Sequence, residues 1–329
     1  MWVERLAAVW SSSLSWPKKI KLSKGGPGFA LSVLKNYDTK NENIMNYDVE
    51  LFIGVCLTYD DFKKFKTVLI SSLQNLYDAF GGKCTVYIVI QSEGHLFNVC
   101  SLYARDWIEF HLTDYFGISN ARNLCIEASL KKNAKFIVFH DASIYWTKSA
   151  ADFIYRCRNK IETPRVNYLF DDNFISQQEL YPLANTHSFT LEYCNPIYNS
   201  YVWTFLFRVN KIRRIRFDIE FGPGEDTKYK SGEDVLFLFK YLEQQRITIY
   251  PLNKKVAVIH PTRPSDYSKH LLYAYGQGVL FRKLLLKYKR ASIALDVMLF
   301  FGNALVRCFF LKKNAFKILH NRLKGFFGG

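Results

Sequence analysis

Strand-like and helix-like segments alternate along the chain between residues 49 and 141, and this alternation constrains the fold more than any other feature. Short apolar runs typical of buried strands cover residues 49–57, 84–90, 107–112 and 135–139. Segments with helical periodicity separate them, at residues 61–80 and 118–131. This order predicts an α/β fold, in which a mostly parallel sheet lies between flanking helices.

The second half of the chain carries weaker signals of the same kind. Strand-like runs cover residues 165–170, 201–209, 246–250 and 255–259, and helical patterns cover residues 231–245 and 270–288. With 49% hydrophobic residues, the chain has ample material for a core, which excludes a disordered or fibrous protein. Parallel sheets bind ligands beyond the carboxyl ends of their strands. The segments to search are therefore residues 58–61, 91–94, 113–123 and 140–143.

The net charge of +16 is concentrated at one end of the chain. Residues 279–329 hold eleven lysines and arginines against one acidic residue, which leaves +10, whereas residues 49–278 hold 27 against 24. An excess of this size calls for an anionic partner. We therefore expect a near-neutral domain in the centre and a basic tail that meets an anionic surface.

The basic tail is also apolar. Residues 293–311 read as a helix on which Asp296, Asn303 and Arg307 fall within about 40° of one another, one narrow polar stripe on an apolar cylinder. No run of 18 uncharged apolar residues occurs, so we expect no ordinary membrane-spanning helix. A helix lying in the interface of an anionic membrane fits best, while a helix packed on the domain and a dimer contact stay open. Nucleic acid is the rival anion, but the bulky apolar side chains and the lack of a nucleic-acid motif favour lipid.

Seven cysteines are spread along the chain without a C-x-x-C pair. Their odd number and apolar neighbours indicate small buried hydrophobes rather than a disulfide scaffold or a zinc ribbon. Residues 1–15 lack the basic start and long apolar core of a signal peptide. We therefore expect a reducing, cytosolic compartment, and we interpret residues 1–48 as an N-terminal extension or linker.

Six short motifs follow one another in order along the chain. They are Gly117-Ile118-Ser119-Asn120-Ala121-Arg122-Asn123, Phe139-His140-Asp141-Ala142-Ser143, Phe221-Gly222-Pro223-Gly224, Ser231-Gly232-Glu233-Asp234-Val235, His260-Pro261 and Tyr275-Gly276-Gln277-Gly278. Over roughly residues 49–290 they make the chain resemble family 2 glycosyltransferases of the GT-A fold, of the type that builds bacterial surface polysaccharides. The resemblance implies a catalytic domain at residues 49–278, with a nucleotide-sugar half at 49–145 and an acceptor half at 146–278, ahead of the tail at 279–329.

The resemblance places a divalent cation on the donor diphosphate. Asp141, at the end of a predicted strand, matches an acidic motif that holds Mn²⁺ or Mg²⁺, which neutralises the diphosphate as it leaves. The second acid of that motif is replaced here by Ser143. His260, water or the diphosphate itself would then complete the metal shell, or the enzyme would need the metal only loosely. The pair Asp171-Asp172 is a fallback metal site.

Four further residues are expected to bind the nucleotide sugar. Arg122 and Asn123 lie at a helix start, where a guanidinium suits a donor phosphate, or pairs with the acid of the next strand as a structural salt bridge. Asp60 and Glu93 follow the first two strands, where the resemblance places the nucleobase and ribose. Gln91 is an alternative to Glu93, and both acids also fit a solvated loop.

Asp234 is the expected general base. An inverting transferase needs a carboxylate that takes the proton of the acceptor hydroxyl as this oxygen attacks the anomeric carbon. The resemblance gives that role to Asp234, with Glu233 beside it, although acids at a helix start are also favoured by the helix dipole. Trp203 is expected to stack on an acceptor sugar or to pack in the core. Gly222 and Gly224 are expected to be hinges of a loop that closes over the acceptor.

The resulting hypothesis is an inverting glycosyltransferase. It would move a hexose from a nucleotide sugar, first of all a UDP-sugar, to a lipid-linked oligosaccharide in the assembly of O-antigen, capsule or a similar polysaccharide. Its expected place is the cytoplasmic side of the inner membrane, as a peripheral protein. The alternatives are a catalytically inactive relative that binds nucleotide sugar, and a basic adaptor for membrane or nucleic acid.

Overall fold

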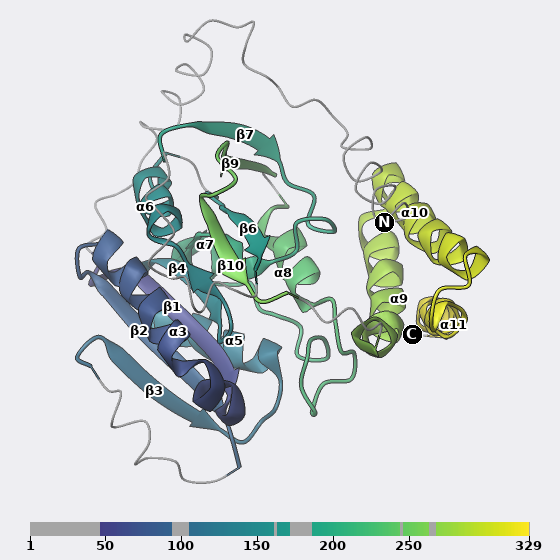
Figure 1. Ribbon diagram of the computed structural model, residues 1–329, viewed down its shortest axis with the longest axis horizontal. Coiled ribbons are helices and arrows are strands. Elements are labelled where there is room, and N and C mark those ends of the chain that lie inside the picture. Colours follow the sequence, from purple (N-terminus) through teal and green to yellow (C-terminus); the bar gives the residue numbers. More distant parts are fainter. Residues whose placement is uncertain are drawn as a thin grey trace, which may run out of the picture.

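The computed structural model describes residues 47–93, 105–160, 163–171, 186–243, 246–262 and 268–328. Its central sheet has five strands in the order β3-β2-β1-β4-β8 (Figure 1). The strands β1 (Val49–Thr58), β2 (Cys84–Gln91), β3 (Ile108–Thr113) and β4 (Ala134–Asp141) are parallel, and the short β8 (Phe207–Arg208) is antiparallel to β4. The α/β fold with a mostly parallel sheet, predicted from the alternating pattern, is confirmed.

The central strand β1 is buried on both faces, which explains its continuous apolar run. Because side chains alternate along a strand, Leu51, Ile53, Val55 and Leu57 join one core cluster, which also holds residues of α3 (Tyr59–Ala79) and α6 (Lys148–Cys157). Phe52 and Cys56 join the other, beneath α5 (Ile118–Lys131). Helices therefore cover both faces of the sheet (Figure 1).

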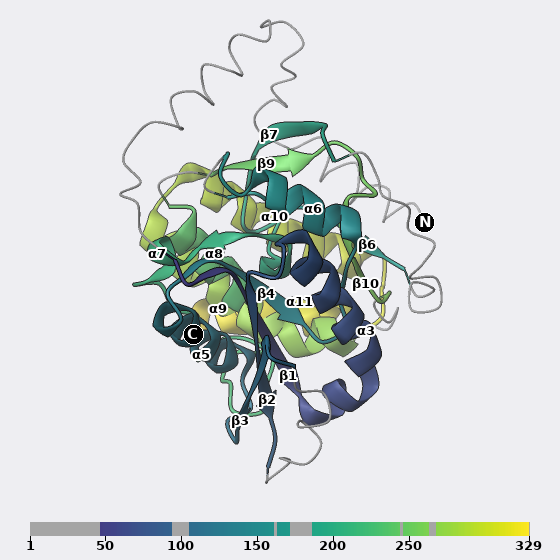
Figure 2. The same cartoon turned by 90° about the vertical axis from the view of Figure 1, so that its left-hand side faces the viewer.

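The second half of the chain builds two smaller sheets beside the first. One has the order β5-β10-β6, from β5 (Tyr145–Trp146), β10 (Ala257–His260) and β6 (Asn167–Phe170). The other pairs β7 (Phe189–Tyr193) with β9 (Ile247–Pro251), and Figure 2 shows this pair at one end of the molecule. The helix α8 (Glu233–Tyr241) lies within the predicted helical range and is shorter than it.

The strand predicted at residues 201–209 is wrong. This segment forms a 3-10 turn at Val202–Thr204, the two-residue strand β8 and the start of α7 (Val209–Ile212). Its apolar run reflects burial rather than strand geometry, because Val202, Phe205 and Phe207 are fully buried. A backbone hydrogen bond from the N–H of Phe205 to the carbonyl of Val202, at 3.1 Å, closes the turn.

Three long helices end the described chain and gather on one side of the molecule (Figure 1). They are α9 (Ser268–Tyr288), α10 (Ala291–Phe309) and α11 (Ala315–Gly328). The predicted boundary between residues 278 and 279 falls inside α9. At this point the backbone of α9 packs directly on that of α11. A Cβ on Gly278 would lie 2.1 Å from the carbonyl oxygen of Arg322, and a Cβ on Gly325 would lie 2.1 Å from that of Tyr275.

The helix α10 differs from its prediction in how it faces the protein. Asp296, expected on a solvated stripe, is buried against the domain, where it accepts hydrogen bonds from the Tyr198 hydroxyl at 2.8 Å and the Asn195 amide at 3.4 Å. By length and composition α10 is also apolar enough to cross a membrane, with a mean hydropathy of 1.6. A search for uncharged runs missed this property because Asp296 and Arg307 interrupt the apolar sequence.

The cysteines in the described ranges are small buried hydrophobes, as predicted. Six of them, Cys56, Cys84, Cys125, Cys157, Cys194 and Cys308, are buried free thiols. Cys100 and nearly all of the N-terminal extension, residues 1–46, lie outside the described residues.

Candidate active site

The carboxyl ends of the parallel strands meet at one edge of the central sheet. Strand register places Thr58 beside Gln91 and Gln91 beside Thr113 at this edge. On the other side of β1, Cys56 pairs with Asp141. Thus all four segments singled out from the sequence begin at this edge, and one of them, residues 113–123, leads from it into α5.

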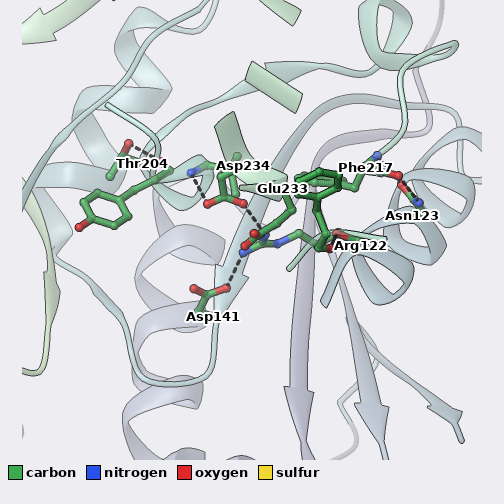
Figure 3. A network of polar contacts seen from close by, with 11 residues as sticks. Arg122, Asn123, Asp141, Thr204, Phe217, Glu233 and Asp234 are labelled. Atoms are coloured by element: carbon green, nitrogen blue, oxygen red, sulfur yellow. Dashed lines mark hydrogen bonds and ion pairs between the residues drawn. The ribbon is translucent and has the colours of Figure 1, made fainter. Parts of the chain in front are cut away.

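Arg122 lies at the centre of a cluster of three carboxylates (Figure 3). Its Nη1 donates to Oδ1 of Asp234 at 2.5 Å and lies 3.7 Å from Oε1 of Glu233. Its Nη2 donates to Oδ1 of Asp141 at 3.1 Å. One guanidinium therefore joins the end of β4 to the start of α8, two segments about ninety residues apart in the sequence.

Burial and mutual repulsion control the protonation of this cluster. Burial lowers the pKa of Arg122, but the attraction of Asp234, Asp141 and Glu233 outweighs it, so the pKa is raised and the guanidinium stays charged. Burial, and then the charge of Asp234, raise the pKa of Glu233. Burial also raises the pKa of Asp234, against the pull of Arg122. A carboxyl whose proton affinity is raised in this way suits general-base chemistry near neutral pH.

The position of Asp141 is set by its neighbour His140, a contact that the sequence analysis missed. The Ser72 hydroxyl accepts from the backbone N–H of Trp146 at 2.7 Å, so its own proton is available for Nε2 of His140, 2.8 Å away. Nδ1 of His140 then carries the single N–H proton of the ring and donates to the backbone carbonyl of Asp141 at 2.8 Å. Burial lowers the pKa of His140 to about 4, which keeps the ring neutral. The signal available in the sequence was Ser72, a polar residue on the buried face of the helix predicted at residues 61–80.

The start of α8 holds Asp234 and Glu233 in place. Gly232, just before the helix, has a φ of +107°, a conformation that favours glycine. The second carboxylate oxygen of Asp234 accepts from the backbone N–H of Val202 at 3.4 Å. Both acids lie in the first helical turn, where the helix dipole stabilises negative charge. The helix dipole favours acids at these two positions by itself, and their functional role stays a prediction.

The loop that carries Gly222 and Gly224 is bound to the start of α5. The backbone N–H of Ile118 donates to the carbonyl of Pro223 at 3.0 Å, and the Ser119 hydroxyl donates to that of Phe221 at 2.6 Å. Gly224 has a φ of +140°, and a Cβ there would lie 2.3 Å from the carbonyl oxygen of Phe116. Gly222 has a φ of +113°, and a Cβ there would lie 2.7 Å from Ile118. Both glycines are required by the packing of this loop against α5, and their role as hinges stays a prediction.

The structure places the other predicted donor residues around the cluster rather than in it. Asn123 binds the backbone of Phe217 in both directions, accepting from its N–H at 2.8 Å and donating to its carbonyl at 3.0 Å. Asp60 extends into solvent from the first turn of α3 and pairs with Lys63 at 2.8 Å. Glu93 is exposed where β2 ends, next to residues 94–104, which lie outside the described ranges, whereas Gln91 is buried.

Trp203 and His260 belong to a cluster of aromatic rings in the predicted acceptor half. Trp203 is buried and stacks on Tyr201 with ring centroids 4.9 Å apart, and on His260 at 6.0 Å. Nδ1 of His260 lies 2.6 Å from the carbonyl of Pro261. Tyr168 and Phe170 of β6 continue this cluster and are 37% and 40% exposed, so their rings are accessible at the surface whereas that of Trp203 is not. The sequence analysis missed both.

The described residues provide only part of a binding site for a divalent cation. Within the described ranges no group of three or more His, Cys, Asp and Glu side chains is arranged to hold a metal ion. Asp141 binds Arg122 through Oδ1 and keeps 31% of its side chain exposed, so this carboxylate is accessible to a cation that arrives with a diphosphate. Asp171 donates its backbone N–H to the carbonyl of His260 at 3.0 Å, and Asp172 lies outside the described residues.

Comparison with known proteins identifies the fold. Models of protein families give no match to this sequence, and no curated protein matches it. Among solved structures, the mannosyltransferase PcManGT from Pyrobaculum calidifontis, in complex with GDP-Man and Mn²⁺, is similar with a TM-score of 0.50 and 12% identity, over 99% of both chains. The chain has the GT-A glycosyltransferase fold.

A second set of similar structures covers less of this chain. The S. aureus TarS fragment 1–349 in complex with UDP-GlcNAc is similar with a TM-score of 0.49 and 19% identity, over 72% of this chain and 67% of that one. In another structure of the same fragment, the chain spans 66% of the fragment's length. At these identities the likeness concerns the fold, and the chemistry of this GT-A chain has to be argued from its own residues.

Proposed function

We propose that the chain is an inverting glycosyltransferase that moves a hexose from a nucleotide sugar to a hydroxyl group of a glycan acceptor. The acceptor oxygen forms a bond to the anomeric carbon while the bond from that carbon to the diphosphate breaks. The hydroxyl proton goes to the carboxylate of Asp234, and the nucleoside diphosphate leaves with the electron pair of the broken bond.

One observation carries this proposal: the guanidinium of Arg122 contacts two acids at once. One is the accessible Asp141 at the end of β4, and the other is the buried Asp234, whose pKa is raised by burial. Arg122 contacts Asp141 on the donor side of the sheet and Asp234 at the start of α8. The donor acid and the base of the proposed reaction are thus fixed relative to each other before any substrate binds. Preorganisation of this kind contributes to catalysis because the groups need no rearrangement as charge develops.

The donor is proposed to lie against the carboxyl ends of β1, β2 and β4. Asp141 would hold Mn²⁺ or Mg²⁺ there, and such a cation supplies charge neutralisation for the departing diphosphate. Asp60 and Glu93 are exposed just after β1 and β2. By the resemblance to family 2 glycosyltransferases, we propose that they contact the nucleobase or ribose. We propose a UDP-sugar as the first donor to test and a GDP-hexose as the second, since PcManGT binds GDP-Man.

The acceptor is proposed to be a lipid-linked oligosaccharide, in a pathway of the O-antigen or capsule type. Support comes from the exposed rings of Tyr168 and Phe170, which offer a stacking surface for sugar beside the site, and from the basic C-terminal region. We further propose a peripheral position on the cytoplasmic side of the inner membrane, where such acceptors are assembled.

Release of nucleotide from a donor panel tests the proposal. The purified full chain is incubated with UDP-, GDP-, dTDP- and CMP-sugars, with and without Mn²⁺ or Mg²⁺, alone and with membrane extract as acceptor source. The proposal predicts release from one donor class, lost in Asp141→Ala and in Asp234→Ala and retained in Asp218→Ala, an acid elsewhere on the surface that pairs with Lys283. No release from any donor, together with no binding of any nucleoside diphosphate, contradicts it.

A further inference from the structure

One face of α10 presents a continuous stripe of apolar side chains to the surroundings. The stripe is made of Leu295, Met298, Leu305, Val306 and Phe309, which recur at the spacing of a single helical face and are between 41% and 83% exposed. The opposite face of the helix is buried, at Ile293, Val297, Ala304 and Cys308 among others. Contiguous exposed apolar surface of this kind marks an interaction site.

The turn into α11 extends the stripe and adds positive charge. Phe310, Leu311 and Phe316 are 52%, 79% and 63% exposed. Exposed lysines stand among and beyond them, at Lys312, Lys313, Lys317 and Lys324. Apolar side chains flanked by cations match the boundary between the acyl chains and the phosphate headgroups of a bilayer.

A groove between α9 and α11 opens beside this surface. It has a volume of about 400 Å³ and is lined by Leu271, Phe316, Lys317, His320 and Asn321. Its lining combines apolar side chains with a lysine and a histidine, a combination that suits a phosphate headgroup and the first part of its acyl chain.

We propose that the outer face of α10, the turn after it and the outer face of α11 form a docking surface for an anionic membrane. In this arrangement α10 lies along the membrane with its apolar stripe below the headgroups. The lysines of the turn and of α11 meet the lipid phosphates. Charge complementarity selects this occupant over a second copy of the chain, because residues 279–329 carry eleven basic residues and one acidic residue, and two such surfaces repel each other.

Contacts across α9 fix this surface relative to the candidate active site. Figure 1 shows α9 between α8 and the outer helices α10 and α11. On one side, Ser231, which lies three residues before Asp234 in the sequence, donates its hydroxyl proton to the carbonyl of Tyr273 in α9 at 3.1 Å. On the other side, Gly278 lets the backbone of α9 contact that of α11. A protein docked in this way would hold its candidate active site at a fixed position relative to the membrane.

Co-sedimentation with vesicles tests the docking surface without any catalytic readout. The full chain is mixed with vesicles of phosphatidylcholine alone, or of phosphatidylcholine and phosphatidylglycerol in equal parts, and the pelleted fraction is measured at low and high salt. We expect binding to the anionic vesicles that high salt releases. Because no donor is present, failure of this test is separate from failure of the proposed transferase activity.

Two variants and two matched controls localise the contact. Lys312→Gln together with Lys313→Gln is expected to lower the partition coefficient by about 30-fold, since each lysine near an anionic surface contributes about 1 kcal/mol. Phe309→Ser is expected to lower it by about tenfold or more. Lys148→Gln with Lys131→Gln, and Leu252→Ser, change exposed residues of the same types on the domain and should leave binding unchanged.

Three results overturn the proposal. The first is a chain that stays in solution with anionic vesicles, or pellets equally with neutral ones. The second is a stable dimer, detected by light scattering, that Phe309→Ser converts to a monomer, because the stripe would then be a contact between copies. The third is a chain that needs detergent for solubility and resists release by high salt, because α10 would then cross the bilayer.

Discussion

Arg122 supplies the positive charge that partly balances the carboxylates of the candidate site. Its side chain is 3% exposed, and it faces three carboxylates at 2.5, 3.1 and 3.7 Å. When all are ionised, three carboxylates against one guanidinium leave a surplus of two negative charges. Burial and this surplus both disfavour the ionised carboxylates, which is why the pKa values of Glu233 and Asp234 are raised.

Removing Arg122 should therefore destabilise the fold as well as the activity. Arg122→Ala leaves buried carboxylates without a partner and is expected to cost about 3–5 kcal/mol, measured by denaturant unfolding. Arg122→Lys keeps the charge but loses the planar fork, so a smaller loss of stability with a lower kcat is expected. Arg213→Ala, at an exposed arginine, is the control. Equal unfolding midpoints for Arg122→Ala and Arg213→Ala would contradict the role of Arg122.

Glu233 should give a pH-dependent effect on stability of known sign. Its raised pKa means that the folded protein binds its proton more tightly than the unfolded chain does. The stability linked to this group is therefore present below its ordinary pKa and is lost as pH rises through the raised value. Glu233→Gln mimics the protonated form, so it should match the unchanged protein at acidic pH and melt about 2 °C or more higher at alkaline pH. A variant that melts lower at alkaline pH would contradict this account.

Among the elements, those with a local signal were predictable and those set by tertiary contacts were not. The four parallel strands and α5 follow from apolar runs and helical periodicity, and they lie where the pattern placed them. The strands β5 and β7 and the helix α6 were missed because they are short, with two, five and ten residues, so their patterns do not stand out from the neighbouring sequence. Similarly, the resemblance named Arg122, Asp141 and Asp234, and a pairing of Arg122 with Asp141 was one of the expected alternatives. The contact of the same guanidinium with Asp234 was not expected, because it depends on packing between segments 112 residues apart.

The crossing of α9 and α11 depends on glycine, and a matched pair of substitutions tests it. Gly278→Ala would place a methyl group 2.1 Å from a backbone carbonyl oxygen, so it is expected to cost about 1–3 kcal/mol or more in unfolding free energy. Gly302→Ala, in α10, meets no atom within 4 Å. It should be neutral or stabilise by up to about 1 kcal/mol through helix propensity. A Gly278→Ala protein as stable as Gly302→Ala would show that the two helices do not pack this closely.

At the scale of the whole molecule, the candidate active site and the proposed docking surface are connected through α9. The central sheet presents the proposed donor acid Asp141, α8 presents the proposed base Asp234, and α9 links that region to the apolar and basic outer helices (Figure 1). The sequence predicted the fold and the concentration of charge in the tail. It did not predict that Asp296 would face inward, since that depends on Tyr198 from another part of the chain.

The most direct test of the central claim separates donor binding from turnover in two variants. Donor binding is measured by calorimetry and transfer by nucleotide release, for the unchanged chain, Asp141→Asn and Asp234→Asn. We expect Asp234→Asn to bind the donor with an unchanged Kd and to lose about 10²–10⁴-fold in kcat, the contribution typical of a general base. Asp141→Asn should instead lose donor binding in the presence of metal. Full turnover by Asp234→Asn, or loss of donor binding in that variant alone, would contradict the assignment of base and donor acid.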